Sequence, residues 1–194
     1  MAHMARSEDI HHGQKNKAPT SPRQALYTPE QRIKRDQSVW TWVQGVLAPV
    51  QFLVFLISLA LVLRYLATGE GQNIALWSVV VKTFTLYTIM VTGCIWEKVV
   101  FDCYLFAPAF YWEDVFSMLV LALHTAYLVA LFTGALGSHA LMYLALAAYG
   151  TYVVNAGQFI WKLRTARLDH ARQQAAIKQA AIKQPATTQG GLTA

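Results

Sequence analysis

Four acidic side chains lie close together in the middle of a chain that has almost no other charge there. Glu97, Asp102, Glu113 and Asp114 all fall within residues 96–114. Carboxyl groups act as proton donors or bases once their surroundings raise the pKa toward neutral, as burial against apolar groups does. The cluster therefore predicts acid–base chemistry in this part of the chain.

The same stretch is rich in aromatic rings, and two interpretations of them remain open. The rings are either an interfacial belt with ordinary solvated acids around it, or the wall of a pocket half sunk in a membrane. In the second case they would stack on a flat apolar ligand. The aromatic residues are Trp96, Phe101, Tyr104, Phe106, Phe110, Tyr111 and Trp112.

A histidine follows the acids inside an apolar stretch. His124 lies eleven residues after Glu113, which is close to three helical turns, so a helix would place both on one face with Ser117 and, slightly to the side, Tyr127. A histidine inside a membrane either bonds a neighbouring helix or takes part in function. Both interpretations stay open at this stage.

Other polar side chains also interrupt the apolar stretches. Lys82 is expected to extend toward the membrane surface or to pair with an acid on another helix. The remaining ones are expected to form hydrogen bonds between helices. They are Gln44, Gln51, Tyr152, Asn155 and Gln158.

Four apolar stretches must position these groups, and each is near the roughly twenty residues that a bilayer core requires. The stretches span about 43–66, 76–96, 115–132 and 141–161. We therefore predict an all-α integral membrane protein with four transmembrane helices and disordered basic tails. Pro49 predicts a kink in the first helix, because proline cannot donate the backbone bond to the residue four before it.

The basic residues indicate how the chain is oriented. Of 16 Lys and Arg, seven precede Trp40 and six lie from Lys162 onward. Basic flanks favour the cytoplasmic side, and an even number of spans places both termini there. The net charge of +6 thus belongs to the ends of a membrane domain, and nucleic acid is not an expected partner.

The chain divides into three parts by composition. Residues 1–26 are polar and read as a disordered tail, 27–169 form the membrane domain, and 170–194 form a low-complexity tail. Thr28 is a good helix N-cap, and Pro29 suits the first turn of a short basic helix. Within the last part, the pentad Gln-Ala-Ala-Ile-Lys occurs twice in succession at 174–183.

The sequence contains no recognised metal or nucleotide motif. Cys94 and Cys103 are nine residues apart, which fits neither a zinc site nor a redox pair. Glycine-rich phosphate loops, HExxH and GxSxG are absent from the sequence. We expect no protein-bound metal.

Several longer runs of sequence are distinctive together: Gln44–Leu53, Tyr87–Gly93, Trp96–Phe101, Tyr104–Phe110, Trp112–Met118 and Tyr152–Phe159. With these runs the chain closely resembles one family, the 3-vinyl (also called 2-vinyl) bacteriochlorophyllide hydratases of phototrophic bacteria. The resemblance covers about residues 27–169 and omits both tails.

The resemblance implies a hydro-lyase of bacteriochlorophyll biosynthesis in the bacterial inner (intracytoplasmic) membrane. It would add water to the C3-vinyl group of a chlorophyllide or bacteriochlorophyllide and give a 1-hydroxyethyl group. No cofactor is implied, and magnesium enters only as part of the substrate. Partners would be the lipid bilayer and other bacteriochlorophyll-synthesis enzymes.

Given that reaction, roles can be suggested for the residues noted above. Glu113 or Asp114 would be the acid, and Glu97 would orient water or stabilise a carbocation. His124 would relay a proton or, less readily, bind the pigment magnesium. The expected substrate-binding residues are Lys98, for the propionate, and the aromatic residues Trp96, Tyr104, Phe110 and Trp112.

Two other classes of protein remain. A non-catalytic tetrapyrrole-binding or photosystem-assembly protein would need the aromatic rings and His124, but has no use for clustered carboxyl groups. A small transporter would show inverted repeats and broken helices. The sequence has Pro49 but no internal symmetry, so a transporter is disfavoured.

Overall fold

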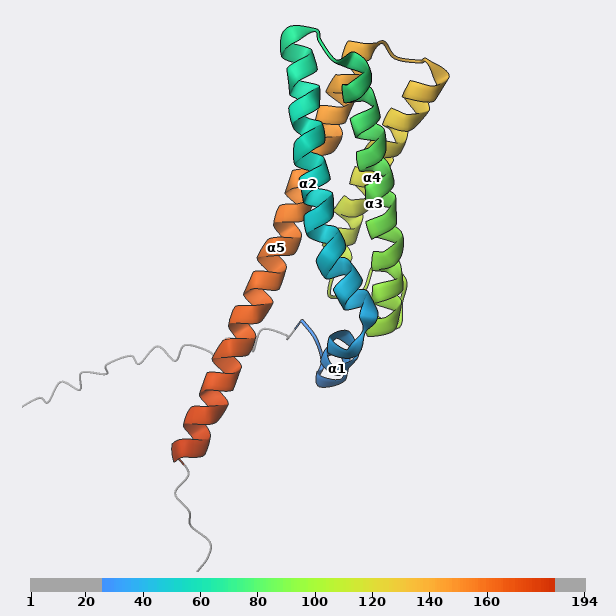
Figure 1. The fold of residues 1–194 in the computed structure, drawn as a ribbon. Helices are drawn as coiled ribbons and strands as arrows, with labels where there is room; N and C mark the ends of the chain where they lie inside the picture. Colours follow the sequence, from blue (N-terminus) through green and yellow to red (C-terminus); the bar gives the residue numbers. More distant parts are fainter. Residues whose placement is uncertain (1–25, 184–194) are drawn as a thin grey trace, which may run out of the picture.

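The computed structural model describes residues 26–183, and within this range the chain is entirely helical apart from turns and one loop (Figure 1). Four of the helices are long and apolar enough to cross a membrane, which confirms the predicted all-α membrane fold. The helices are α1 (Pro29–Gln37), α2 (Val39–Thr68), α3 (Gln72–Phe101), α4 (Tyr111–Thr133) and α5 (Ser138–Lys183).

The four long helices form two hairpins. α2 packs mainly against α3, and α4 mainly against α5, while the two hairpins approach each other at fewer places. The turns of both hairpins lie at one end of the bundle, and α1 and the loop 102–110 lie at the other (Figure 1). Gly69 and Gly134 end their helices with positive φ, a conformation that glycine adopts without steric cost.

α1 begins as predicted. The Thr28 side chain accepts a hydrogen bond from the Gln31 backbone, and the Gln31 side chain accepts one from the Thr28 backbone. This reciprocal pair is a capping box, and Pro29 occupies the first turn. Tyr27, just before the cap, is buried with the Arg35 guanidinium 4.7 Å above its ring, so the start of the helix is anchored to the bundle.

The long helices exceed the thickness of a bilayer core. A 30-residue helix such as α2 or α3 is about 45 Å long, against roughly 30 Å of hydrocarbon, so its ends extend into the interface. The predicted spans lie inside the observed helices. α2 continues through Pro49, and the predicted kink at this residue remains a prediction.

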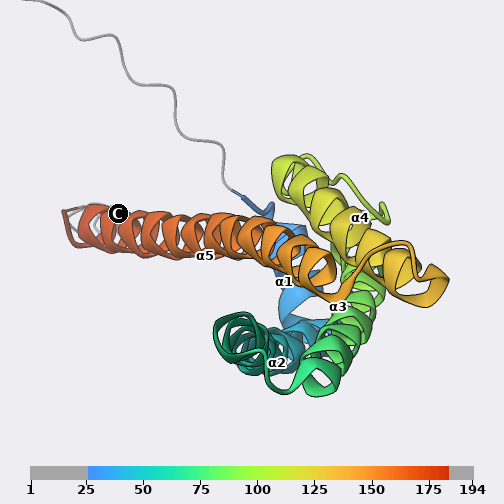
Figure 2. The ribbon, with the colours of Figure 1, turned by 90° about the horizontal axis from the view of Figure 1, so that it is seen from above.

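α5 is longer than expected. It runs to Lys183 and projects beyond the other helices (Figures 1 and 2), so the expectation of disorder was wrong for residues 170–183. The pentads consist largely of Ala, Gln and Lys, which are strong helix formers. Residues 1–25 and 184–194, the rest of the expected tails, lie outside the described part.

Polar side chains connect the helices inside the bundle. The amide of Gln44 donates to the Thr92 hydroxyl at 2.7 Å, and that of Asn155 donates to the Ser117 hydroxyl at 2.9 Å. These two contacts confirm the expected interhelical hydrogen bonds for Gln44 and Asn155. They fix the level of α2 against α3 and of α4 against α5. In the described part of the chain, Gln51 Oε1 and Gln158 Oε1 are buried without a hydrogen-bond partner, so the expectation was wrong for these two oxygens.

Candidate active site

Three of the four clustered acids meet at the end of the bundle that carries the loop. Glu97 is in the last turns of α3, and Glu113 and Asp114 are in the first turn of α4. Each is less than one-tenth exposed. Asp102 does not join them: it is exposed, and the Lys98 ammonium, which donates to its carboxyl group, holds the pKa of Asp102 below its ordinary value.

Glu97 and Asp114 form a carboxyl pair. Their carboxyl groups lie within hydrogen-bonding reach of each other, and two neighbouring carboxylates cannot both ionise without strong repulsion. Each also accepts a backbone N–H from the loop: Ala107 N lies 3.4 Å from Glu97 Oε2, and Phe106 N lies 2.9 Å from Asp114 Oδ2. The pair is therefore built to share one proton.

The loop above the pair holds a strained backbone conformation. Phe106 has φ of 60°, a left-handed value that costs a bulky residue about 1–3 kcal/mol. This conformation accompanies the hydrogen bond from its N–H to Asp114. The loop is closed further by a 2.7 Å bond from Phe110 N to the Ala107 carbonyl, which leads directly into α4.

Glu113 has a different partner. Its carboxylate accepts a hydrogen bond from Lys162 of α5 and forms an ion pair with it. The Glu113 carboxyl group is therefore already engaged by a charged partner on α5. Lys162 was not among the predicted site residues, since in the sequence it only begins the basic C-terminal region.

A buried aromatic cluster lies at the same end of the bundle, with Phe110 at its centre. Phe110 is 2% exposed and lies 5.7–6.3 Å, centroid to centroid, from each of the other rings. The predicted substrate-binding residues Trp96 and Phe110 are therefore packed on other rings of the protein. The members of the buried aromatic cluster are Tyr27, Trp96, Phe101, Phe110 and Phe159.

A second set of rings, the exposed aromatic group, borders the same carboxyl groups on the outside. Tyr104, Phe106, Tyr111 and Trp112 are 62%, 43%, 48% and 67% exposed. Lys98 lies near this group, with its Nζ 5.5 Å from the Tyr104 ring centroid. Of the predicted substrate-binding residues, Lys98, Tyr104 and Trp112 are therefore exposed at this end of the bundle.

The structure does not bring His124 to the carboxyl groups. Glu113, Ser117, His124 and Tyr127 are all buried on one face of α4, which confirms the predicted face. However, ten residues separate His124 from Asp114, which is about 15 Å along a helix. His124 lies instead beside Tyr149, with ring centroids 5.9 Å apart.

Lys82 is also deep in the bundle, and both expectations for it were wrong. It is fully buried, so it does not reach the membrane surface, and no acid pairs with it in the part of the chain that the structure describes. Its Nζ lies 4.2 Å from the Tyr152 ring centroid. The face of that ring offers a cation an attractive site in place of a carboxylate.

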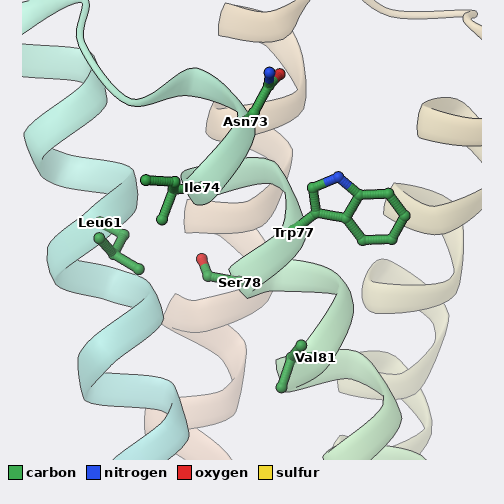
Figure 3. Close-up of a pocket in the computed structure, with 6 residues that line it drawn as sticks. All are labelled: Leu61, Asn73, Ile74, Trp77, Ser78 and Val81. Carbon is green, nitrogen blue, oxygen red and sulfur yellow. The ribbon is translucent and has the colours of Figure 1, made fainter.

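Two surface grooves lie away from the carboxyl groups. One of about 400 Å³ lies at the opposite end of the bundle, between α2 and α3, with Trp77 and Val81 on its wall (Figure 3). Another of about 450 Å³ lies on α5 beside Trp161 and Arg164. Between residues 26 and 183, no three His, Cys, Asp or Glu side chains gather as a metal site.

Comparison with known proteins gives consistent results. The family model described as 2-vinyl bacteriochlorophyllide hydratase (BCHF) matches residues 27–165. A 2-vinyl bacteriochlorophyllide hydratase from Cereibacter sphaeroides is 69% identical over 153 residues, which are 78% of this chain and 94% of that protein. One from Rhodobacter capsulatus is 63% identical over 159 residues, 81% of this chain and 92% of that protein. No solved structure matches the chain.

Proposed function

The chain belongs to the 2-vinyl bacteriochlorophyllide hydratase family, and we propose that its reaction takes place at the Glu97–Asp114 carboxyl pair. The activity is that of a membrane hydro-lyase of bacteriochlorophyll biosynthesis, which adds water to the vinyl group of a bacteriochlorophyllide. The observation that supports this site is the pair itself, two buried carboxyl groups within hydrogen-bonding reach of each other and bordered by exposed aromatic rings.

The reaction requires one proton donor and one base. The donor transfers a proton to the terminal vinyl CH2, and the positive charge develops on the carbon attached to the macrocycle, which delocalises it. Water then forms a bond to that carbon while a base takes one of its protons. The product is a 1-hydroxyethyl group, and the two carboxyl groups together have lost and recovered one proton.

We assign the resting proton to Glu97 and the charge to Asp114. Asp114 accepts the shorter backbone bond, 2.9 Å against 3.4 Å for Glu97, and a hydrogen bond to a carboxylate favours its charged form. After Glu97 protonates the vinyl group, the pair carries two negative charges and becomes a strong base for the attacking water. This replaces the initial choice of Glu113 or Asp114 as the acid.

We propose that Glu113 serves electrostatics rather than proton transfer. Its ion pair with Lys162 holds its carboxylate in a fixed position beside the carboxyl pair. A preorganised carboxylate there stabilises the carbocation more than the neutral substrate, which is what lowers a barrier.

The pigment would approach from the membrane edge. A chlorophyllide is flat and apolar, so it can pack on the exposed aromatic group with its propionate outward, near Lys98. We propose no separate cofactor, because hydration transfers no electrons, and magnesium enters only with the substrate. His124 has no role in proton transfer in this scheme, since it lies about 15 Å along α4 from Asp114.

We further propose the bacterial inner (intracytoplasmic) membrane as the location, with both termini cytoplasmic. Supporting this, seven basic residues precede Trp40 and six lie from Lys162 onward, and α1 and the projecting part of α5 are at the same end (Figure 1). The carboxyl pair is at that end too. Contact with other bacteriochlorophyll-synthesis enzymes would follow from a substrate and product that both stay in the membrane.

The test compares matched variants in purified membranes supplied with a vinyl pigment and H2¹⁸O. Glu97→Gln and Asp114→Asn should lower the rate of labelled hydroxyethyl pigment formation by about 10²–10⁴-fold. Asp102→Asn, the exposed acid of the same stretch, should retain the wild-type rate. Normal rates in both pair variants would exclude this site, and unlabelled product from the wild type would favour a pigment-binding protein without catalysis.

A further inference from the structure

Several buried polar atoms in the bundle have no protein partner. In the described part of the chain, five side-chain atoms are buried without a hydrogen bond. Such atoms are costly unless something else satisfies them. They come from all four long helices: Gln51 Oε1, Lys82 Nζ, His124 Nε2, Asn155 Oδ1 and Gln158 Oε1.

The atoms of Gln158, Asn155, Lys82 and His124 follow one another from the carboxyl site into the bundle. On α5, Gln158 and Asn155 are one and two turns from Lys162 and lie on the same face as it. Asn155 is bonded to Ser117, which is one turn of α4 beyond Glu113. We call the five residues with unpartnered atoms the polar column. The Glu113–Lys162 ion pair thus lies next to its lower end.

Lys82 and His124 form the upper end of the polar column. Tyr152, one turn beyond Asn155 on α5, has the Lys82 ammonium 4.2 Å from its ring centroid. His124 Nδ1 lies 2.8 Å from the Val120 carbonyl; a carbonyl only accepts, so Nδ1 carries the proton of the neutral ring and Nε2 holds a lone pair. The column therefore contains one strong donor and four acceptors.

Water is the ligand that fits such a set. Buried water molecules typically make two to four hydrogen bonds and bind where polar groups would otherwise be unsatisfied. Water both donates and accepts, so it can connect the Lys82 ammonium to the amide oxygens and to His124 Nε2. The polar column also lies where the two hairpins meet, and these approach each other less often than the helices within each hairpin do.

We propose that the polar column binds a chain of internal water molecules that supplies the reacting water to the carboxyl pair. This rests on the proposed function at the pair. A vinyl pigment held by the exposed aromatic group covers the site from the membrane edge, so water arriving through the bundle interior would reach it from another direction. Lys82, Asn155 and Gln158 are then positioning residues, which act through the water that they hold.

Hydroxyl-radical footprinting of the purified protein tests the water directly. A short X-ray pulse produces radicals from bound water inside a protein, and mass spectrometry locates the oxidised side chains. Tyr152, only 8% exposed, should be oxidised because it borders the column. Met142, which is fully buried in the apolar core and intrinsically more reactive, should be protected.

Variants give the matched comparison. Asn155→Leu and Lys82→Met should each reduce Tyr152 oxidation at least fivefold. With two variants, the test still gives an answer if one of them does not fold. Gln44→Leu removes an amide whose nitrogen donates to the Ile89 carbonyl and the Thr92 hydroxyl, and it should leave Tyr152 oxidation unchanged. Tyr152 as protected as Met142 in the wild type would overturn the proposal.

Kinetics test the supply of water separately. Asn155→Leu should lower kcat at least tenfold with KM for the pigment within twofold of wild type. An unchanged kcat in a variant that has lost Tyr152 oxidation would refute the supply role. Glu97→Gln should remain oxidised at Tyr152, whatever its activity, so failure of the carboxyl pair as the reaction site is distinguishable from failure of the water column.

Discussion

The ion pair between Lys162 and Glu113 allows a quantitative test of the site's electrostatics. Replacing Lys162 with Met leaves the Glu113 carboxylate buried without its partner. Losing one member of a fully buried pair costs about 3–5 kcal/mol. Because the side chains here are 27% and 10% exposed, water screens part of this, and we expect about 2 kcal/mol.

The assay is thermal unfolding of the detergent-purified protein. About 2 kcal/mol corresponds to a fall in Tm of about 4–8 °C for a chain of this size. Adding Glu113→Gln to Lys162→Met should recover most of the loss, because the double variant has no unpaired charge.

The control is Lys98→Met, which removes a cation of similar reach from an exposed ion pair with Asp102. Exposed ion pairs contribute little to stability, so the Tm of Lys98→Met should differ from that of the wild type by less than the experimental uncertainty in Tm. Equal losses in Lys162→Met and Lys98→Met would refute the reasoning. So would a double variant no more stable than Lys162→Met alone.

Three further predictions concern the loop, the exposed rings and the C-terminal helix. Phe106→Gly should be more stable than Phe106→Ala by about 1 kcal/mol and should therefore have the higher Tm. Both variants lose the ring, but only glycine relieves the strain of the positive φ. Equal Tm values would argue against backbone strain at this residue. Trp112→Ala should raise KM for the pigment severalfold with kcat nearly unchanged. Trp77→Ala, at a similarly exposed tryptophan at the other end of the bundle, should alter neither constant. The same effect in both variants would exclude the exposed aromatic group as the binding surface for the pigment. Truncation after Asp169 should leave activity and Tm within error of wild type, because the part of α5 after this residue projects away from the other helices. A marked loss of activity or stability would show that this segment has a role.

The fold was largely predictable because its signals are local. Apolar length identified the four spans, and Thr28 with Pro29 identified the start of α1, since a cap involves only neighbouring residues. The error at residues 170–183 arose because low complexity was read as disorder. The Ala, Gln and Lys composition of the pentads in fact favours a helix, and no tertiary contact is needed to form it.

The site was predictable as a set of residues but not as an arrangement. The sequence places Glu97, Glu113 and Asp114 near one another, yet pairing of Glu97 with Asp114 depends on a loop whose turn at Phe106 has no glycine to signal it. Lys162 is 49 residues from Glu113, and only the antiparallel packing of α5 on α4 brings them together.

Helical periodicity also has a limit that His124 illustrates. A spacing of eleven residues correctly places His124 on the face of Glu113 but says nothing of level, and the two are about 16 Å apart along the axis. Lys82 shows a related limit, because a favourable aromatic face on another helix cannot be read from its own surroundings in the sequence. The spacing of residues in the sequence predicts which face of a helix a side chain lies on. Its contacts on other helices depend on how the helices pack.

Infrared difference spectroscopy of the carboxyl pair tests the central claim most directly. At neutral pH the wild type should show the C=O stretch of one protonated carboxylic acid. That band should disappear in Glu97→Gln and persist in Asp102→Asn and Glu113→Gln. A wild-type spectrum without a protonated carboxyl group, or a band that persists in Glu97→Gln, would contradict the account.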